Sequence, residues 1–343
     1  MGWSPDSNHV LRDTGRNAPL NAGQDSVLTE EGPPQPGRIS GPPHTGPQEE
    51  NGSQRSRIGV VHLVRAANGI APLRRFLESF RLHPPGVSCD LVLVFKGFHG
   101  NKVPPEYIES LRETPHIKFF VGDTGYDILP YFKTARHFPH DAFCFMNSFS
   151  VILGDGWLGR LHAHLQEPDV GLVGATGSWQ SIYSDSLKWH QQRIPLWKRA
   201  VVVPWKLYLK KRFDPFPNFH VRTTAFMISR EAMLKIRHGR IRTKMAAWIF
   251  ESGKNGLTKQ ILATNKRALI VGRNGRAYRM EEWSRSGTFW QGRQENLLVA
   301  DKQTQRYDQG DQKERDYLEA YAWWDPAGQQ SEINGRDPGS ECQ

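Results

Sequence analysis

Between residues 58 and 153, short apolar runs alternate with amphipathic segments. Residues 58–64 form a continuous run rich in Val, Leu and Ile, which is typical of a parallel strand buried on both faces. Runs of the same character lie at 89–98, 116–123 and 142–153. Between them, apolar positions recur at helical spacing, and prolines such as Pro72 suit a first helical turn. This repeated alternation predicts a doubly wound, mostly parallel α/β sheet.

The second half of the chain is less regular. A strand-like run covers 219–231, and a helical pattern covers 243–263 with an interruption at 251–256. A polar helix is expected at 311–324, ending in an aromatic cluster. In sheets of this class, ligands bind beyond the carboxyl ends of the strands, so we look for chemistry in the loops at that edge.

The two ends of the chain have a different composition. Residues 1–56 are rich in Gly, Pro, Ser, Asn and Gln and contain almost no apolar cluster, and the residues after 325 are similar. Such segments bury too little apolar surface to offset their chain entropy. We therefore expect a disordered tail at 1–56, a folded domain at 57–325 and a second tail at 326–343.

Net charge and cysteine content bear on the class of partner and on the cellular compartment. The net charge of +10 favours anionic partners, such as phosphate-bearing molecules, nucleic acid or an acidic membrane face. The three cysteines are isolated, with no metal-like spacing, and no apolar run is long enough to span a bilayer. We expect a cytoplasmic protein.

Four short segments fall at the predicted carboxyl edge, and their order along the chain is informative. They are VVHLVRAANG, VGDTGYDILPY, CFMNSFSVILGDGWL and FESGKNGLTKQI. Over roughly residues 57–310 the chain resembles GT-A glycosyltransferases of family 2 and of the rhamnan-synthesis type. The resemblance implies a GT-A-like fold and transfer of a sugar from a nucleotide-activated donor.

The segment VGDTGYDILPY is similar to an acidic turn of that family. The resemblance implies that Asp123, Gly125 and Asp127 lie beside the donor nucleotide. Asp123 or Asp127 could instead cap the helix that follows, which is the commonest role of aspartate at such a position.

The strand end in CFMNSFSVIL departs from the usual family pattern. Family 2 enzymes carry Asp-x-Asp here to hold a divalent cation, whereas this chain has Asn147 and Ser148, as the rhamnan-synthesis type similarly does. Mg²⁺ usually takes one or two carboxylates together with phosphates. The need for Mg²⁺ or Mn²⁺ is therefore left open. Asp155 could supply one ligand or could simply start the next helix.

Basic side chains are the alternative partners for a donor diphosphate. Arginine suits this task because its planar fork matches phosphate oxygens. By resemblance the donor-binding candidates are Arg65, His220, Arg222, Arg285 and Arg293. Any one of these arginines could equally be an exposed surface charge.

The catalytic base and the acceptor contacts follow from the same resemblance. Glu251 matches the acidic residue that takes the proton of the acceptor hydroxyl, and the family places it at the opening of a helix. Trp179 and Tyr183, within a loop rich in small hydroxyl residues, match the acceptor region. Glu251 could otherwise be a solvated helix-end acid, and Trp179 could pack on the sheet.

Residues 187–212 form a basic aromatic insert, with eight Lys or Arg and no acidic residue. Pro195 and Pro204 are expected to divide it into short helical pieces. The insert could lie on an anionic membrane face, act as a lid, or bind single-stranded nucleic acid. Nucleic acid ranks last because of the neighbouring transferase motifs. The membrane reading would place the protein at the inner face of the plasma membrane.

Together these features predict a hexosyltransferase-type enzyme of polysaccharide biosynthesis. It would move a sugar from a nucleotide-sugar donor to a glycan or lipid-linked acceptor, with inversion, and it could do so without a metal. The alternatives are a carbohydrate- or nucleotide-binding module on a degenerate transferase fold, and a basic nucleic-acid-binding protein.

Overall fold

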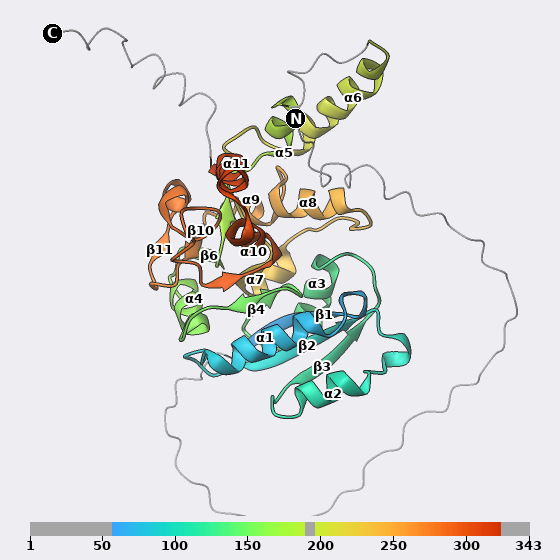
Figure 1. Ribbon diagram of the computed structural model, residues 1–343, viewed down its shortest axis with the longest axis vertical. Helices are drawn as coiled ribbons and strands as arrows, with labels where there is room; N and C mark the ends of the chain where they lie inside the picture. The colour runs from blue at the N-terminus through green and yellow to red at the C-terminus, as the bar shows by residue number, and fades with distance from the viewer. Residues whose placement is uncertain (1–56, 189–195, 324–343) are drawn as a thin grey trace, which may run out of the picture. The chain divides into compact units, whose positions relative to one another are not determined.

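The computed structural model describes residues 57–188 and 196–323 (Figure 1). Both tails predicted from the sequence, 1–56 and 326–343, lie outside the described residues. The described part is built around an eight-stranded sheet. In spatial order its strands are β11 (Ala277–Tyr278), β10 (Arg267–Val271), β6 (Val170–Gly174), β9 (Ala225–Ser229), β4 (Ala142–Met146), β1 (Ile58–Arg65), β2 (Asp90–Lys96) and β3 (Ile117–Val121).

The sheet is mixed but mostly parallel, which confirms the predicted fold class. β3, β2, β1 and β4 are parallel neighbours, and β6 and β10 form a second parallel pair. β9 runs antiparallel between β4 and β6, and β11 is antiparallel at one edge. Because β9 is reversed, it begins at the edge where its neighbours end. Residues 222–224, just before β9, therefore reach the carboxyl edge of the parallel strands.

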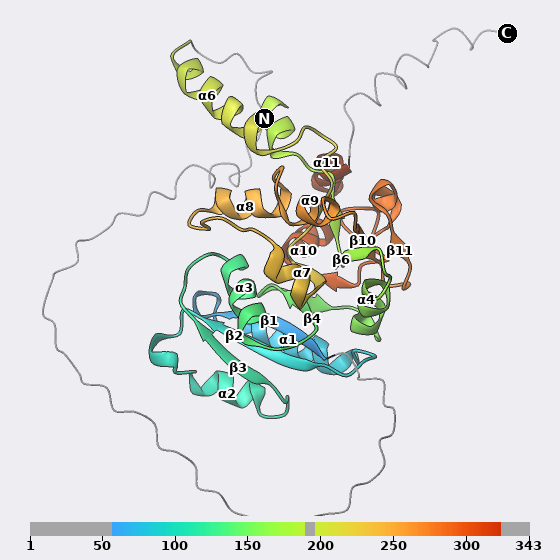
Figure 2. The same cartoon turned by 180° about the vertical axis from the view of Figure 1, so that it is seen from behind.

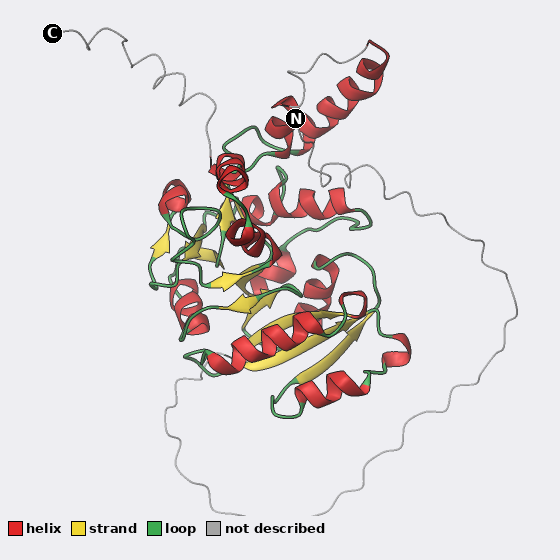
Figure 3. Cartoon of the chain, viewed as in Figure 1, coloured by secondary structure: helices red, strands yellow, loops and turns green. Residues whose placement is uncertain are grey.

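Helices cover both faces of the sheet (Figures 2 and 3). The α-helices are α1 (Ala71–Leu82), α2 (Pro105–Leu111), α3 (Ile128–His137), α4 (Trp157–Leu165), α5 (Ile182–Lys188), α6 (Leu196–Arg212), α7 (Arg230–Lys235), α8 (Lys244–Ser252), α9 (Leu257–Leu262), α10 (Lys302–Gln309) and α11 (Gln312–Trp323). Two small ladders pair β5 (Val151–Ile152) with β12 (Val299–Ala300) and β7 (Gly177–Ser178) with β8 (His220–Val221). Short 3₁₀ turns are η2 (Ala66–Asn68), η3 (His99–Asn101) and η4 (Met280–Arg285).

The apolar run of β1 explains why both faces are covered. Val61 and Leu63 point into one core, against α3, α7, α8 and α9, whereas Val60 and Val64 point into the other, against α1, α2 and α4. Successive side chains of a strand face opposite sides, so a strand buried on both faces reads as an unbroken apolar run. Each fully buried aliphatic side chain contributes about 1.5 to 3 kcal/mol.

Several element boundaries differ from the sequence prediction, among them the following three. The run at 142–153 is two strands, β4 and β5, because Asn147 Oδ1 accepts a 2.9 Å hydrogen bond from the Phe149 amide and closes a turn between them. α6 continues through Pro204 instead of breaking there. The interruption after α8 is confirmed, but Glu251 lies in the last turn of α8, not at the opening of a helix.

Candidate functional site

Glu251 meets the start of β9 at the carboxyl edge of the sheet. The Thr223 hydroxyl donates a 2.5 Å hydrogen bond to Oε2 of Glu251. Asn218 Nδ2 donates to the Ser252 carbonyl at 2.7 Å, so the segment that leads into β9 is tied to the end of α8 at two points. Glu251 is half-buried, and its carboxylate is held in one orientation by a group of the sheet edge.

A second polar group lies at the ends of β1 and β2. Arg65 donates from Nε and Nη2 to the two carboxylate oxygens of Asp123, each at 3.1 Å. Lys96 Nζ lies 3.4 Å from Asp123 Oδ1 and donates to the Tyr126 carbonyl at 2.7 Å. The hydrogen bond from Arg65 holds the pKa of Asp123 below its usual range, while burial lowers the pKa of Lys96. Asp123 is therefore ionised at neutral pH and already paired.

The turn between β3 and α3 brings Asp127 between these two groups. Gly125 allows the turn, because its φ of 72° is unfavourable for other residues and a Cβ there would lie 2.1 Å from Leu129 Cγ. Asp127 is the N-cap residue of α3, yet its side chain makes no capping hydrogen bond. Burial raises the pKa of Asp127; Lys96 and Arg65 lower it, and Glu251 raises it further. Asp127 and Glu251 thus belong to one electrostatic neighbourhood.

Arg222 and His220 enter the same edge from the strand pair β7–β8. Arg222 Nη2 donates to Asp301 Oδ2 at 2.9 Å, and the guanidinium lies 4.0 Å from the centre of the Phe289 ring. Both charged side chains are almost completely buried, and Nη1 of Arg222 has no hydrogen-bond partner among the described residues. His220 Nδ1 is bound to the Asn218 carbonyl at 2.8 Å, and burial lowers the pKa of the ring.

The end of β4 is lined by an amide and hydroxyls. Asn147 Oδ1 accepts from the Phe149 amide and from the Ser150 hydroxyl, and Ser148 beside it is buried. This donor set does not fit a divalent cation, because the amide oxygen is committed to its own turn and no carboxylate adjoins it. Within 57–188 and 196–323, no group of three or more His, Cys, Asp or Glu could hold a metal.

Asp155 is paired with a histidine. Its carboxylate lies 2.7 Å from His83 Nδ1, just beyond the last residue of α1. The role of Asp155 as a possible metal ligand stays a prediction.

The predicted acceptor and C-terminal donor residues are more dispersed. Trp179 packs in an aromatic cluster with Phe219 and Trp323, and its indole N–H donates to the Met280 carbonyl at 3.0 Å. Tyr183 is half-buried on α5. Arg285 and Arg293 are exposed, in η4 and in the loop that follows it.

Four residues of this edge escaped the sequence analysis: Lys96, Thr223, Asp301 and Tyr131. A lysine that closes the apolar run of β2 was a readable signal, since a buried strand rarely ends in a charge without a partner. The other three give no such signal. The Tyr131 hydroxyl is buried and has no hydrogen-bond partner in the part of the chain that the structure describes, and burial together with Asp127 and Glu251 raises its pKa well above the ordinary value.

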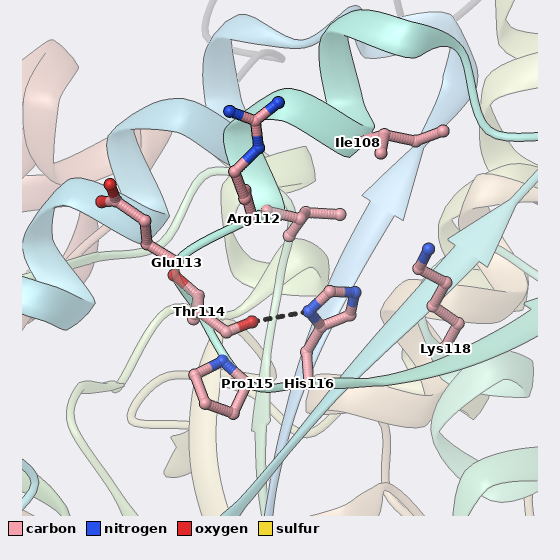
Figure 4. Close-up of a pocket in the computed structure, with 8 residues that line it drawn as sticks. Ile108, Arg112, Glu113, Thr114, Pro115, His116 and Lys118 are labelled. Atoms are coloured by element: carbon pink, nitrogen blue, oxygen red, sulfur yellow. Dashed lines mark hydrogen bonds between the residues drawn. The ribbon is translucent and has the colours of Figure 1, made fainter.

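A separate pocket of about 430 Å³ lies where α2 meets the start of β3, with Ile108, His116 and Lys118 in its lining (Figure 4). It lies at the amino end of the edge strand, away from the polar edge described above. None of the described helices is both long and apolar enough to cross a membrane.

Comparisons with known proteins give partial likeness only. No family model and no curated protein matches the chain. Among solved structures, a mannosyltransferase from Pyrobaculum calidifontis, in complex with GDP-Man and Mn²⁺, is similar at 14% identity and a TM-score of 0.40; the match covers 63% of this chain and 55% of that one. Mouse xyloside xylosyltransferase 1 is similar at 12% identity and a TM-score of 0.34, over 61% of this chain and 81% of that one. S. aureus TarS 1–349 is similar at 13% identity and a TM-score of 0.28, over 34% of each chain. At these scores the matches assign neither a family nor an activity.

Proposed function

We propose that this chain is a GT-A-type glycosyltransferase whose active site lies at the carboxyl edge of the sheet. The observation that carries the proposal is the hydrogen bond from Thr223 to Glu251, at an edge that also holds Asp127, Lys96 and Arg222. A half-buried, oriented carboxylate next to cationic side chains suits a general base that works beside an anionic donor.

The reaction would be a single displacement. Glu251 takes the proton of an acceptor hydroxyl, and the oxygen of that hydroxyl attacks the anomeric carbon of the donor sugar. The bond from this carbon to the nucleoside diphosphate breaks, and the diphosphate leaves with the bonding electron pair. One displacement inverts the configuration at the anomeric carbon.

Cationic side chains of this chain would stabilise the leaving diphosphate. The Nη1 donor of Arg222 is buried and has no hydrogen-bond partner among the described residues, and Lys96 is held at the end of β2 beside the turn that we assign to the nucleotide. His220, Arg285 and Arg293 remain candidates for the same role, as do Asn147 and Ser148. We propose a glycan or lipid-linked acceptor, near Trp179 and Tyr183.

One observation favours the alternative of a non-catalytic binding module. Both arginines nearest the edge are already paired with carboxylates, Arg65 with Asp123 and Arg222 with Asp301. Cations neutralised in this way offer less charge to a diphosphate.

Ligand-induced stabilisation distinguishes these functions. Melting temperature is measured with nucleoside diphosphates and nucleotide sugars, each with and without Mn²⁺ or Mg²⁺, because a ligand at a hundred times its Kd stabilises a protein by about 2.7 kcal/mol. A donor that stabilises the chain and is consumed when an acceptor is added supports the transferase. Stabilisation without turnover supports the binding module, and no response to any nucleotide removes both the transferase and a nucleotide-binding module.

A further inference from the structure

The helix pair α5–α6 exposes apolar side chains that the described residues leave uncovered. Of the ten large apolar side chains that are exposed in the described part of the chain, four lie here: Leu187, Val203, Trp205 and Leu207. Val203 and Leu207 are 52% and 61% exposed, and they lie four residues apart on one face of α6. Such a concentration on two adjacent helices marks an interaction surface.

Basic side chains accompany these apolar ones. Lys210 and Lys211 are exposed one turn beyond Leu207, so they continue the face of Val203 and Leu207. Residues 202–212 contain no acidic residue. An exposed aliphatic face that carries only positive charge is complementary to an anionic, partly apolar surface.

Among the described residues, α6 is held to the domain along its other side and at its carboxyl end. Leu209 and Phe213 are buried, and the Lys254 amide donates to the Arg212 carbonyl at 2.8 Å. Both ribbon views show α6 extending away from the sheet (Figures 1 and 2). Residues that anchor α6 are therefore distinct from those that it exposes.

We propose that α5–α6 is a docking surface for an anionic lipid bilayer. Val203 and Leu207 would enter the interface, and Lys210 and Lys211 would pair with anionic head groups. A nucleic acid fits less well, because it offers nothing to the aliphatic side chains and because the aromatic faces are in use. The rings of Trp205 and Tyr208 stack at 5.5 Å, and Arg212 lies over Tyr208. A lid closed on the domain would bury Val203 and Leu207, which are exposed instead.

The position of α6 links this surface to the candidate active site. α6 ends at Arg212, and the chain then leads to His220 and Thr223. The Arg212 carbonyl accepts a hydrogen bond from the amide of Lys254, two residues after Ser252. A bilayer in contact with α6 would therefore lie near the edge of the sheet that holds Glu251. The docking surface does not depend on the proposed activity, and its test uses no nucleotide.

The test is co-sedimentation of the full chain with vesicles of phosphatidylcholine alone or of phosphatidylcholine with phosphatidylserine. We expect binding only to the anionic vesicles. The double variant Lys210→Gln/Lys211→Gln should weaken binding by about fivefold for each charge removed. Val203→Asp/Leu207→Asp should abolish it, while the buried anchors Leu209 and Phe213 remain unchanged.

A control carries changes of the same kind on the segment around the edge strand β3. Lys102→Gln/Lys118→Gln removes two exposed charges, and Ile108→Asp alters an isoleucine that is 53% exposed. These variants should bind as the parent does. Equal losses in the control, equal binding to neutral vesicles, or no binding by the parent chain would each overturn the proposal. Tight binding to a single-stranded oligonucleotide, lost in the α6 variants while vesicle binding is absent, would assign the surface to nucleic acid instead. Circular dichroism of each variant checks that it is folded.

Discussion

The Thr223 hydroxyl and the Glu251 carboxylate are joined by a 2.5 Å hydrogen bond across 28 residues of sequence. The bond fixes the carboxylate at the end of α8 against the start of β9. A base of this kind needs both orientation and access to an acceptor hydroxyl, and the half-buried position of Glu251 provides both.

Replacement of either partner should separate chemistry from orientation. We expect Glu251→Gln to slow sugar transfer by roughly 10² to 10⁴, because the general base is lost while the shape is kept. Thr223→Val should slow turnover by about tenfold, since one hydrogen bond to a charged group is removed. Thr224→Val is the matched control and should transfer as the parent does. Unchanged turnover in Glu251→Gln would eliminate the assigned base.

The two aspartates of the β3–α3 turn should respond to pH in opposite directions. Burial raises the pKa of Asp127, so its ionised form destabilises the native state at neutral pH. Asp127→Asn should raise the melting temperature at neutral pH, and the gain should disappear as the pH falls through the native pKa of Asp127 towards the ordinary aspartate range. The measurement is a melting temperature as a function of pH.

Asp123→Asn is the counterpart with the opposite sign. Arg65 lowers the pKa of Asp123, so its ionised form stabilises the native state above the ordinary aspartate pKa. The variant should lose stability at neutral pH, by no more than about 1 kcal/mol because the pair is partly exposed. This loss should vanish as the pH falls through the native pKa. Changes of melting temperature of the same sign in Asp127→Asn and Asp123→Asn would contradict the environments that we assign to the two aspartates.

The buried pair of Arg222 and Asp301 should be costly to break from one side. Arg222→Met or Asp301→Asn alone should each lower the free energy of unfolding by about 3 to 5 kcal/mol, because a buried charge loses its partner. Asparagine keeps the cap of α10 that Asp301 Oδ1 provides. The double variant should be less destabilised than the sum of the two, as measured by urea unfolding. Strict additivity would show that the pair is not coupled.

His62 should make the protein sensitive to acid. Its ring is fully buried, stacks on Phe76 at 3.7 Å, and has no hydrogen-bond partner on either nitrogen in the described part of the chain. Burial lowers the pKa of His62 from 6.5 to about 3. In the unfolded chain His62 therefore binds a proton below pH 6.5, whereas in the native state it binds one only below about pH 3.

His62→Leu should remove this sensitivity to acid and also the buried polar nitrogens of the ring. We expect it to stabilise the protein at neutral pH by about 1 to 3 kcal/mol. Below pH 6.5 its advantage should grow by about 1.4 kcal/mol per pH unit. Parallel stability curves for variant and parent across this range would show that His62 is not the titrating group.

Gly125 should be intolerant of any side chain. At a φ of 72°, the Cβ of Gly125→Ala would collide with Leu129, so the turn that carries Asp123 and Asp127 must shift. We expect a loss of about 1 to 3 kcal/mol in unfolding free energy and weaker binding of a nucleotide. Gly122→Ala is the control, because no atom lies within 4 Å of its Cβ. Equal stability of the two variants would contradict the strained turn.

The pattern of apolar runs was enough to predict the fold class, because a strand that is buried on both faces consists of consecutive apolar residues. β1 and β2 are recognisable for this reason, and the parallel order then places their ends at one edge. Asp123, Gly125, Asp127 and Glu251 could be selected from local motifs at those ends. Lys96 could also have been selected, as the charge that closes a buried run.

Only the tertiary structure decided which of these side chains meet. Thr223 reaches Glu251 because β9 is reversed between β4 and β6, and no local pattern encodes the pairing of a strand with distant neighbours. The pairing of Arg222 with Asp301, 79 residues away, is decided in the same way, and so is the pairing of Asp155 with His83. Sequence periodicity records what each residue buries, whereas contacts between segments depend on sheet order, which is set by the packing of the whole domain.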